Sequence, residues 1–166
     1  MKTAALLLTL FLGVAIPSRA ADGKFEVRAV APRPGLPGTS EYVLDDGGGD
    51  SVTLSLGSEI LLDTTALASA EARGESGAWS IVVELTAAGK ERLGEVTARF
   101  VGRRLAILIN GKARCAPVVQ SAILDGSFVI GGNFTEDDVR QLAADLNAAV
   151  KREPATPTPA ATPGNP

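Results

Sequence analysis

Apolar residues in the middle of the chain recur with two different periods. Between Ala78 and Leu85 they follow the two-residue alternation of a β-strand. After Thr86 the spacing changes to that of a helix with one buried stripe. Thr86 is a favourable N-cap and Gly102 suits the C′ position, so the pattern predicts a strand followed by a capped helix. The positions on the two buried faces are Trp79, Ile81 and Val83 in the strand and Leu93, Val96, Thr97 and Phe100 in the helix.

The next segment predicts a hairpin. A strand over 103–109 runs into Asn110-Gly111, two residues that tolerate the positive φ of a tight turn. The return strand leads to Cys115-Ala116-Pro117. Arg103 and Arg104 open the first strand and point to opposite faces. They are either the exposed start of that strand or an anchor for a partner carboxylate.

A third strand and a second helix complete this region. A turn at Asp125-Gly126 precedes the strand Phe128 to Ile130, which Gly131-Gly132 is expected to end. Thr135 and Asp138 then form a pattern typical of a capping box. The predicted buried stripe of the helix that follows is Val139, Leu142, Ala143, Leu146 and Val150.

The N-terminal part carries shorter apolar runs separated by flexible segments. Ala31 to Ser40 is rich in Pro and Gly and predicts a loop, and Asp45 to Asp50 predicts an acidic turn. The aspartates of that turn lack the ligand spacing of an EF-hand, so we expect no calcium site. Leu67 to Arg73 is compatible with strand or helix. The predicted strands are Phe25 to Val30, Glu41 to Leu44, Ser51 to Leu56 and Glu59 to Leu62.

Taken in order, these motifs resemble the head subdomain of SecD, the accessory subunit of bacterial protein export. The likeness extends from Ile60 to Ala149, and Cys115 stands where the family motif usually has serine. It implies an α+β fold in which a small antiparallel sheet carries two helices on one face, with the N-terminal strands as additions. It also implies a role in holding exported polypeptide outside the membrane. The residues that carry the resemblance are Thr86-Ala-Ala-Gly89, Val101 to Gly111, Ala116-Pro117, Gly126 and Ile130 to Thr135.

The ends of the chain differ from its centre. Residues 1–20 have the basic start, apolar stretch and small-residue cleavage site of a signal peptide, with an uncleaved anchor as the alternative. Residues 153–166 contain mainly Pro, Thr and Ala and predict a disordered tail. The division is therefore 1–20 signal peptide, 21–58 N-terminal strands and loops, 59–152 SecD-head-like domain, and 153–166 tail. We expect an exported protein, periplasmic or extracellular, that is soluble after cleavage.

The composition of the chain excludes several classes of function. Without the predicted signal peptide the chain keeps 14 of its 16 basic residues against 19 acidic ones, a net charge of −5, which argues against nucleic acid. The absence of histidine excludes Ser-His-Asp and Cys-His catalysis. Cys115 is the only cysteine, so no internal disulfide is possible, and its position favours a buried thiol over a reactive one. We expect no enzyme activity, no cofactor and no metal.

The leading hypothesis is a non-catalytic module that binds polypeptide or a membrane or envelope protein, with a link to protein export. Binding would use an open sheet edge. The alternatives are a structural or accessory docking protein for one dedicated envelope partner, and a regulator or inhibitor of a periplasmic hydrolase. The candidate contact residues are Arg104, Asn110, Gly111, Lys112, Pro117, Gln120 and Asp125.

Overall fold

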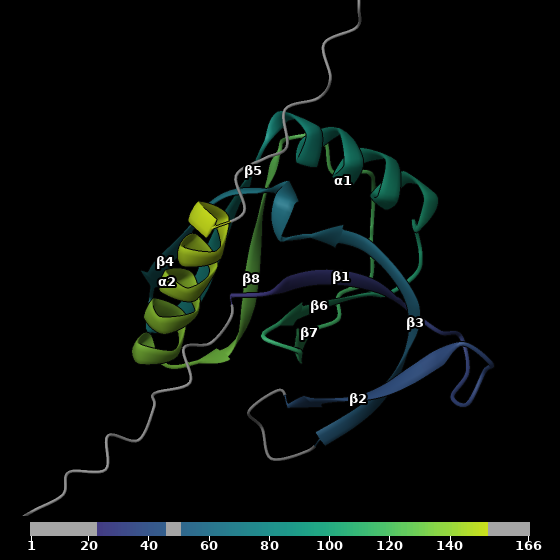
Figure 1. Cartoon of the computed structure of the whole chain (residues 1–166). Helices are drawn as coiled ribbons and strands as arrows, with labels where there is room; N and C mark the ends of the chain where they lie inside the picture. The colour runs from purple at the N-terminus through teal and green to yellow at the C-terminus, as the bar shows by residue number, and fades with distance from the viewer. Residues whose placement is uncertain (1–22, 46–50, 153–166) are drawn as a thin grey trace, which may run out of the picture.

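The β-strands of this protein form two separate layers that share one core with two helices (Figure 1). The structure, a computed structural model, describes residues 23–45 and 51–152. The predicted signal peptide, the centre of the acidic turn (46–50) and the predicted tail lie outside the described residues. The elements are β1 (Phe25–Val30), β2 (Thr39–Asp45), β3 (Ser51–Asp63), η1 (Thr64–Ala66), β4 (Leu67–Glu75), β5 (Ala78–Leu85), α1 (Ala87–Arg99), β6 (Leu105–Ile109), β7 (Lys112–Cys115), β8 (Ser127–Phe134) and α2 (Glu136–Arg152).

Five strands close into a barrel in the order β1-β3-β2-β7-β6. β1 lies between β3 and β6 and is antiparallel to both, with Phe25 opposite Ile109. The contact between β2 and β7 is much shorter, since Leu44 and Ala113 are the one residue pair that joins them. The barrel therefore has a weak seam between β2 and β7.

The remaining strands form an antiparallel sheet in the order β4-β5-β8. Its inner face carries Ile81, Val83 and Ile130, all fully buried. Trp79 extends this face and lies over its cross-strand partner Gly74, where an added Cβ would come within 2.8 Å of the indole. Trp79 is half-buried and packs against the core, as its position in the alternation predicted.

Strand β6 connects the two layers because it is buried on both faces. Its odd-numbered residues Leu105, Ile107 and Ile109 face the main core with the sheet and helices. Ala106 and Leu108 face a second apolar cluster built from barrel strands. An uninterrupted apolar run of this length is typical of a strand covered on both sides.

The helix termini follow the sequence closely. The Thr86 hydroxyl accepts a hydrogen bond from the Gly89 N–H at 3.1 Å. Thr135 and Asp138 cap α2 reciprocally: the Asp138 N–H donates to the Thr135 hydroxyl (3.2 Å) and the Thr135 N–H to the Asp138 carboxylate (3.0 Å). α1 ends at Arg99 and its C-cap is Phe100, so the C′ position is Val101. Gly102, which was predicted to be C′, has a positive φ of +77° but lies one position beyond it.

Two expectations about the strands are wrong. The α+β class with two helices is confirmed, but the strands do not make one small sheet with N-terminal additions. β1, β2 and β3 instead close a barrel with the hairpin 105–115, because β6 is paired with β1 over five residues. Gly131-Gly132 does not end its strand, which continues to Phe134 with a register shift opposite Trp79.

The N-terminal expectations are also revised in detail. Leu67 to Arg73 is strand, within β4. The two short strands predicted over 51–62 are one, β3, so the boundary drawn between 58 and 59 passes through a strand. β2 begins at Thr39, inside the predicted loop, because its residues pair with β3 as far as Gly57.

Candidate functional site

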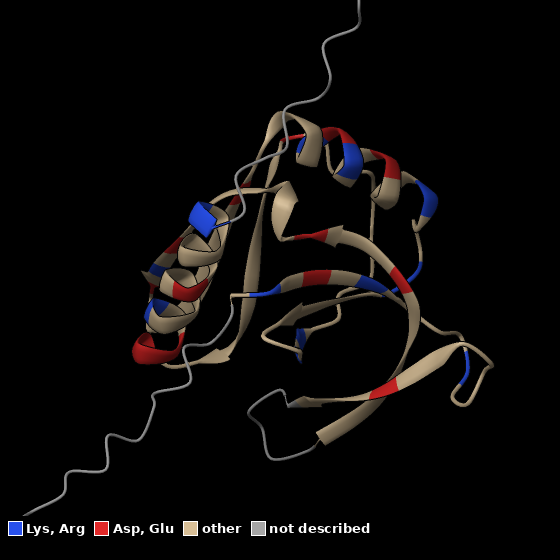
Figure 2. Ribbon diagram, viewed as in Figure 1, with Lys and Arg blue, Asp and Glu red and all other residues tan. Residues whose placement is uncertain are grey.

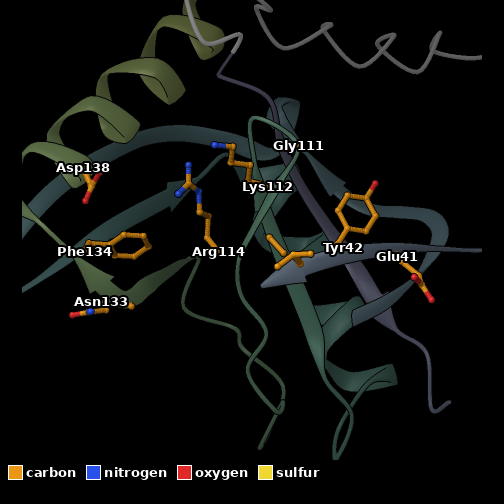
Figure 3. Close-up of a pocket in the computed structure, with 11 residues that line it drawn as sticks. Glu41, Tyr42, Gly111, Lys112, Arg114, Asn133, Phe134 and Asp138 are labelled. Atoms are coloured by element: carbon orange, nitrogen blue, oxygen red, sulfur yellow. The ribbon is translucent and has the colours of Figure 1, made fainter. Parts of the chain in front are cut away.

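A hollow lies at the barrel seam, where β2 and β7 meet the end of β8. It has a volume of about 600 Å³ and is open to solvent (Figure 3). We call it the seam groove. Its lining residues are Glu41, Tyr42 and Val43 from β2, Gly111 to Arg114 from the hairpin, Gly132 to Phe134 from β8, and Asp138 from α2.

The groove exposes an unpaired strand edge. β2 is paired with β3 along its whole length, from Thr39 to Asp45. On its other edge the pair Leu44–Ala113 is the one strand contact among the described residues. The backbone of residues 39–43 on that edge thus has no strand partner in the described part of the chain. Exposed N–H and C=O groups in such a row can pair with an added strand.

The edge of the three-stranded sheet at β4 is different. Asn147 of α2 donates its side-chain amide to the Ala70 carbonyl at 2.7 Å and accepts from the Ala70 N–H at 3.0 Å. One side chain therefore occupies both backbone groups that Ala70 directs outward. This edge is blocked at its centre, so it is a poor site for strand addition.

Apolar side chains lie beside the free edge of β2. Val43 is 59% exposed, and Tyr42 and Phe134 are half-buried in the groove. A β-branched and two aromatic side chains are suited to contact an extended chain whose backbone they flank.

Two cations also line the groove. Arg114 is the extra residue of a β-bulge, since Cys115 lies opposite Ile107 while Ala113 lies opposite the next residue, Leu108. The bulge directs the Arg114 side chain into the groove beside Lys112 (Figure 3). The Nε of Arg114 is buried and makes no hydrogen bond to any described residue. Sequence reasoning missed Arg114, although its spacing of two residues from Lys112 in a strand was a signal that both side chains lie on one face.

Two carboxylates line the groove, those of Glu41 and Asp138. The hydrogen bonds of Asp138 with the Thr135 hydroxyl and backbone N–H hold its pKa below the usual range, and the charge of Arg114 lowers the pKa further. The Asp138 carboxylate is thus ionised and committed to the helix cap.

Six of the seven predicted contact residues form three groups. Gly111 and Lys112 line the seam groove. Arg104 lines another hollow, and its Nε donates a hydrogen bond to the Ala116 carbonyl at 2.9 Å. The neighbouring Arg103 has its guanidinium carbon 4.7 Å from the centroid of the Phe100 ring. Pro117, Gln120 and Asp125 are exposed in the segment between β7 and β8.

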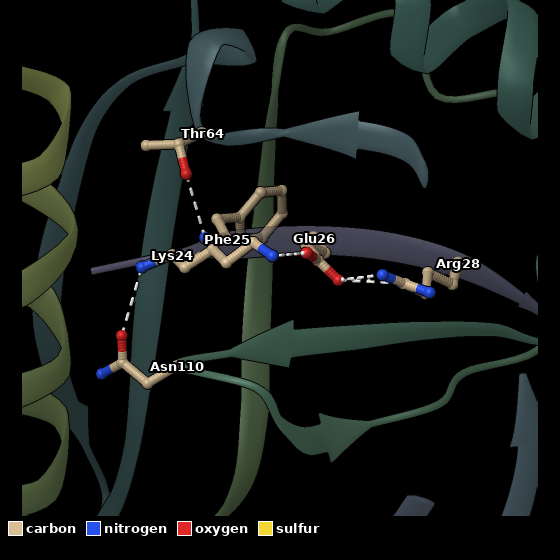
Figure 4. A network of polar contacts seen from close by, with 6 residues as sticks. All are labelled: Lys24, Phe25, Glu26, Arg28, Thr64 and Asn110. Carbon is tan, nitrogen blue, oxygen red and sulfur yellow. Dashed lines mark hydrogen bonds and ion pairs between the residues drawn. The ribbon is translucent and has the colours of Figure 1, made fainter. Parts of the chain in front are cut away.

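Asn110, the remaining predicted contact, is tied to its own protein (Figure 4). Its N–H donates to the Lys24 carbonyl at 2.8 Å, and its side-chain oxygen accepts from the Lys24 N–H at 3.2 Å. Its amide nitrogen donates to buried Asp145 of α2 at 3.1 Å, and Gln141 donates to the other oxygen of that carboxylate at 2.8 Å. Asn110 therefore joins the hairpin turn to Lys24, the residue before β1, and to α2.

A second polar network lies on β1, where Glu26 is 4% exposed (Figure 4). Burial would raise the pKa of the Glu26 carboxyl. Hydrogen bonds and charges of Lys24 and Arg28 outweigh burial and hold that pKa below its ordinary value. The Arg28 Nε donates to the carboxylate at 2.8 Å. None of the three charged residues lines the seam groove.

Cys115 is half-buried, and burial raises the pKa of its thiol to about 11. The thiol is therefore protonated at neutral pH, in agreement with the expectation of a buried thiol rather than a reactive one. No three His, Cys, Asp or Glu side chains within 23–45 and 51–152 are grouped so that they could hold a metal ion. None of the helices in those ranges is long and apolar enough to cross a membrane.

The comparisons with known proteins agree on one family. A family model described as SecDF, P1 head subdomain, matches residues 40–150. The protein translocase subunit SecD of Rickettsia conorii is 42% identical over 60 residues, which cover 36% of this chain and 12% of the relative. SecD of Sebaldella termitidis is 36% identical over 89 residues, which cover 53% of this chain and 22% of the relative.

A solved structure described as "Structure and function of a membrane component SecDF that enhances protein export" has the same fold. Its TM-score is 0.63 at 24% identity, covering 78% of this chain and 64% of that one. The chain spans less than a quarter of the length of the two curated relatives named above. The family model covers most of the chain between β2 and the end of α2, and the chain belongs to the SecDF P1 head subdomain family.

Proposed function

We propose that this protein is a non-catalytic, exported module that binds an extended segment of polypeptide in the seam groove and acts in protein export. The bound chain belongs to an exported protein or to a membrane or envelope partner. The observation that carries the proposal is the free edge of β2, which is paired on one side along its length and on the other at Leu44 only.

Strand addition suits a binder of many sequences. Backbone hydrogen bonds provide affinity without reading side chains, and flanking apolar residues add contact area. The seam groove offers both, with Val43 and Phe134 next to the free edge. The edge of β4 is blocked at Ala70, so β2 is better suited to strand addition than β4.

The family supports the link to export. The SecD relatives are translocase subunits, and the solved structure of similar fold is described as enhancing protein export. We assign to this chain the contact with the translocating polypeptide and no motor function. A periplasmic or extracellular location, as the N-terminal sequence predicts, fits that role.

The test is crosslinking in cells with a photo-reactive residue at Lys112, followed by mass spectrometry of the captured proteins. Lys112 is exposed and lines the groove. The control carries the same residue at Glu91, which is exposed on α1 outside the groove. We expect many exported chains or translocon subunits at position 112 and few at position 91. One dominant partner of another kind would instead indicate a dedicated docking protein and contradict the export proposal.

A further inference from the structure

We infer that the seam groove prefers extended segments that carry a carboxylate side chain, which it holds between Lys112 and Arg114. This inference rests on the proposed function and adds to it a chemical selectivity. Strand addition by itself does not distinguish acidic from neutral sequences. The two cations beside the free edge supply the distinction.

The position of the cations follows from the hairpin. Lys112 is the first residue of β7 and is exposed, while Arg114 is half-buried two residues later. Residues two apart in a strand project from the same face, so Lys112 and Arg114 lie on one face of β7. Arg114 is also the extra residue of the bulge, which leaves it without a residue opposite in β6. Figure 3 shows both side chains extending in the same direction within the groove.

The carboxylates that line the groove form no ion pair with these cations within 4.0 Å, although the charge of Arg114 acts on Asp138. Asp138 accepts the hydrogen bonds of the Thr135 hydroxyl and N–H on its Oδ2 atom. Glu41 points away from Lys112 and Arg114 in Figure 3. No ion pair within 4.0 Å involves Lys112 or Arg114 among the described residues.

A ligand carboxylate would complete the coordination of Arg114. The guanidinium binds carboxylates through two parallel N–H donors, and hydrogen bonds of this charged kind are stronger than neutral ones. The buried Nε of Arg114 has no partner among the described residues, so the protein itself leaves part of the hydrogen-bonding capacity of this guanidinium unused. The groove is partly open, so the selectivity is moderate and sensitive to salt.

The experiment uses the mature protein and two fluorescent peptides that share a β-prone sequence and differ only in a central Glu or Gln. Affinities are measured by fluorescence anisotropy. We expect the Glu peptide to bind about tenfold more tightly, a difference typical of a charge-assisted hydrogen bond. Arg114→Gln should bring the two affinities to the same value, and Lys112→Gln should reduce the difference. Arg73→Gln, at an exposed position of β4 outside the groove, is the matched control and should keep it.

Two further measurements distinguish an electrostatic preference for the Glu peptide from a loss of protein stability in the Arg114→Gln variant. Raising the salt concentration from about 0.05 M to about 0.5 M should shrink the Glu–Gln difference in the wild type. If half-buried Arg114→Gln lowers the melting temperature, the exposed Lys112→Gln variant and the salt series decide the question. Equal affinity of the two peptides for the wild type would overturn the inference while leaving polypeptide binding intact. Failure of both peptides to bind would overturn the inference and the proposed function together.

Discussion

At the scale of single residues, the chain uses polar side chains mainly to hold its parts together. Asn110 illustrates this, because it combines a positive φ of 54° with hydrogen bonds to Lys24 and α2. Asn is among the few residues that tolerate this backbone conformation, and a tight turn alone would explain its presence. The bond to Asp145 shows a second function that the sequence did not reveal.

Replacing Asn110 by Ala should therefore lower the free energy of unfolding by about 2–3 kcal/mol. The change removes two side-chain hydrogen bonds, leaves buried Asp145 with one partner fewer and places alanine at positive φ. Urea unfolding followed by circular dichroism measures the effect. Gln120→Ala, at an exposed site, is the control and should change stability by less than about 0.5 kcal/mol. A loss of the same small size at Asn110 would show that the network contributes little.

Glu26 should make stability depend on pH. Its pKa in the folded protein lies below the ordinary value of 4.5, so the carboxylate stabilises the fold fully above that pH. The contribution is lost as the pH falls through the lowered pKa, because the unfolded chain then binds the proton more readily. The stability difference between wild type and Glu26→Gln should be largest near neutral pH and shrink below about pH 4. A difference that is constant over this range in urea unfolding would contradict the assignment.

At the scale of elements, glycine decides how closely α1 approaches the rest of the protein. Gly89 and Gly94 are both buried in this helix, but their surroundings differ. A Cβ at Gly89 would lie 2.2 Å from the backbone oxygen of Ala66 in η1, whereas one at Gly94 would meet the flexible end of Leu124 at 3.1 Å. The first position cannot adapt without moving the backbone.

Gly89→Ala should destabilise the protein by about 1–3 kcal/mol, because the overlap exceeds the gain in helix propensity. Gly94→Ala is the matched control, where the propensity gain of up to about 1 kcal/mol offsets the crowding and leaves stability nearly unchanged. Thermal unfolding of the two variants measures the contrast. Equal melting temperatures would mean that η1 can move away from α1.

Sequence patterns located most of these elements. The caps at Thr86 and Thr135, the β1 and β5 strands and both helix stripes are local features, and local chemistry specifies them. The bulge at Arg114 and the continuation of β8 through Gly131 were not predicted, since both depend on the strand that lies opposite. The candidate site was found only in part for the same reason: Lys112 was named, whereas Tyr42, Val43 and Arg114 join it through tertiary contacts.

At the scale of the whole molecule, the barrel and the helical layer depend on each other. β1 contributes Phe25 and Val27 to the core that α1 and α2 cover. The charged residues of both helices, of both signs, lie outside that core (Figure 2). The part of β3 before residue 59 also contributes Leu54 and Leu56 to the second cluster. The segment 59–152 thus lacks part of both cores.

We expect a fragment of residues 59–152 to be unfolded and one of residues 23–152 to be folded. Removing β1, β2 and most of β3 exposes the edge of β6 that pairs with β1, and it uncovers apolar residues that belong to both cores. Dispersion of amide signals in proton–nitrogen NMR spectra distinguishes the two outcomes. A well-dispersed spectrum for 59–152 would establish it as an independent domain, as the sequence alone suggested.

The sequence by itself determined most of the helices and strands, the helix caps, the family and the exclusion of histidine-based catalysis. Each of these depends on residue type and on spacing within a short segment. The tertiary structure decided which strands are neighbours, and with it the barrel, its seam and the groove. β1 and β6 are separated by about 80 positions in the chain, and alternation shows that each is a strand but not which edge it joins. The free edge of β2 exists only because β7 pairs with it at one residue, which no local pattern encodes.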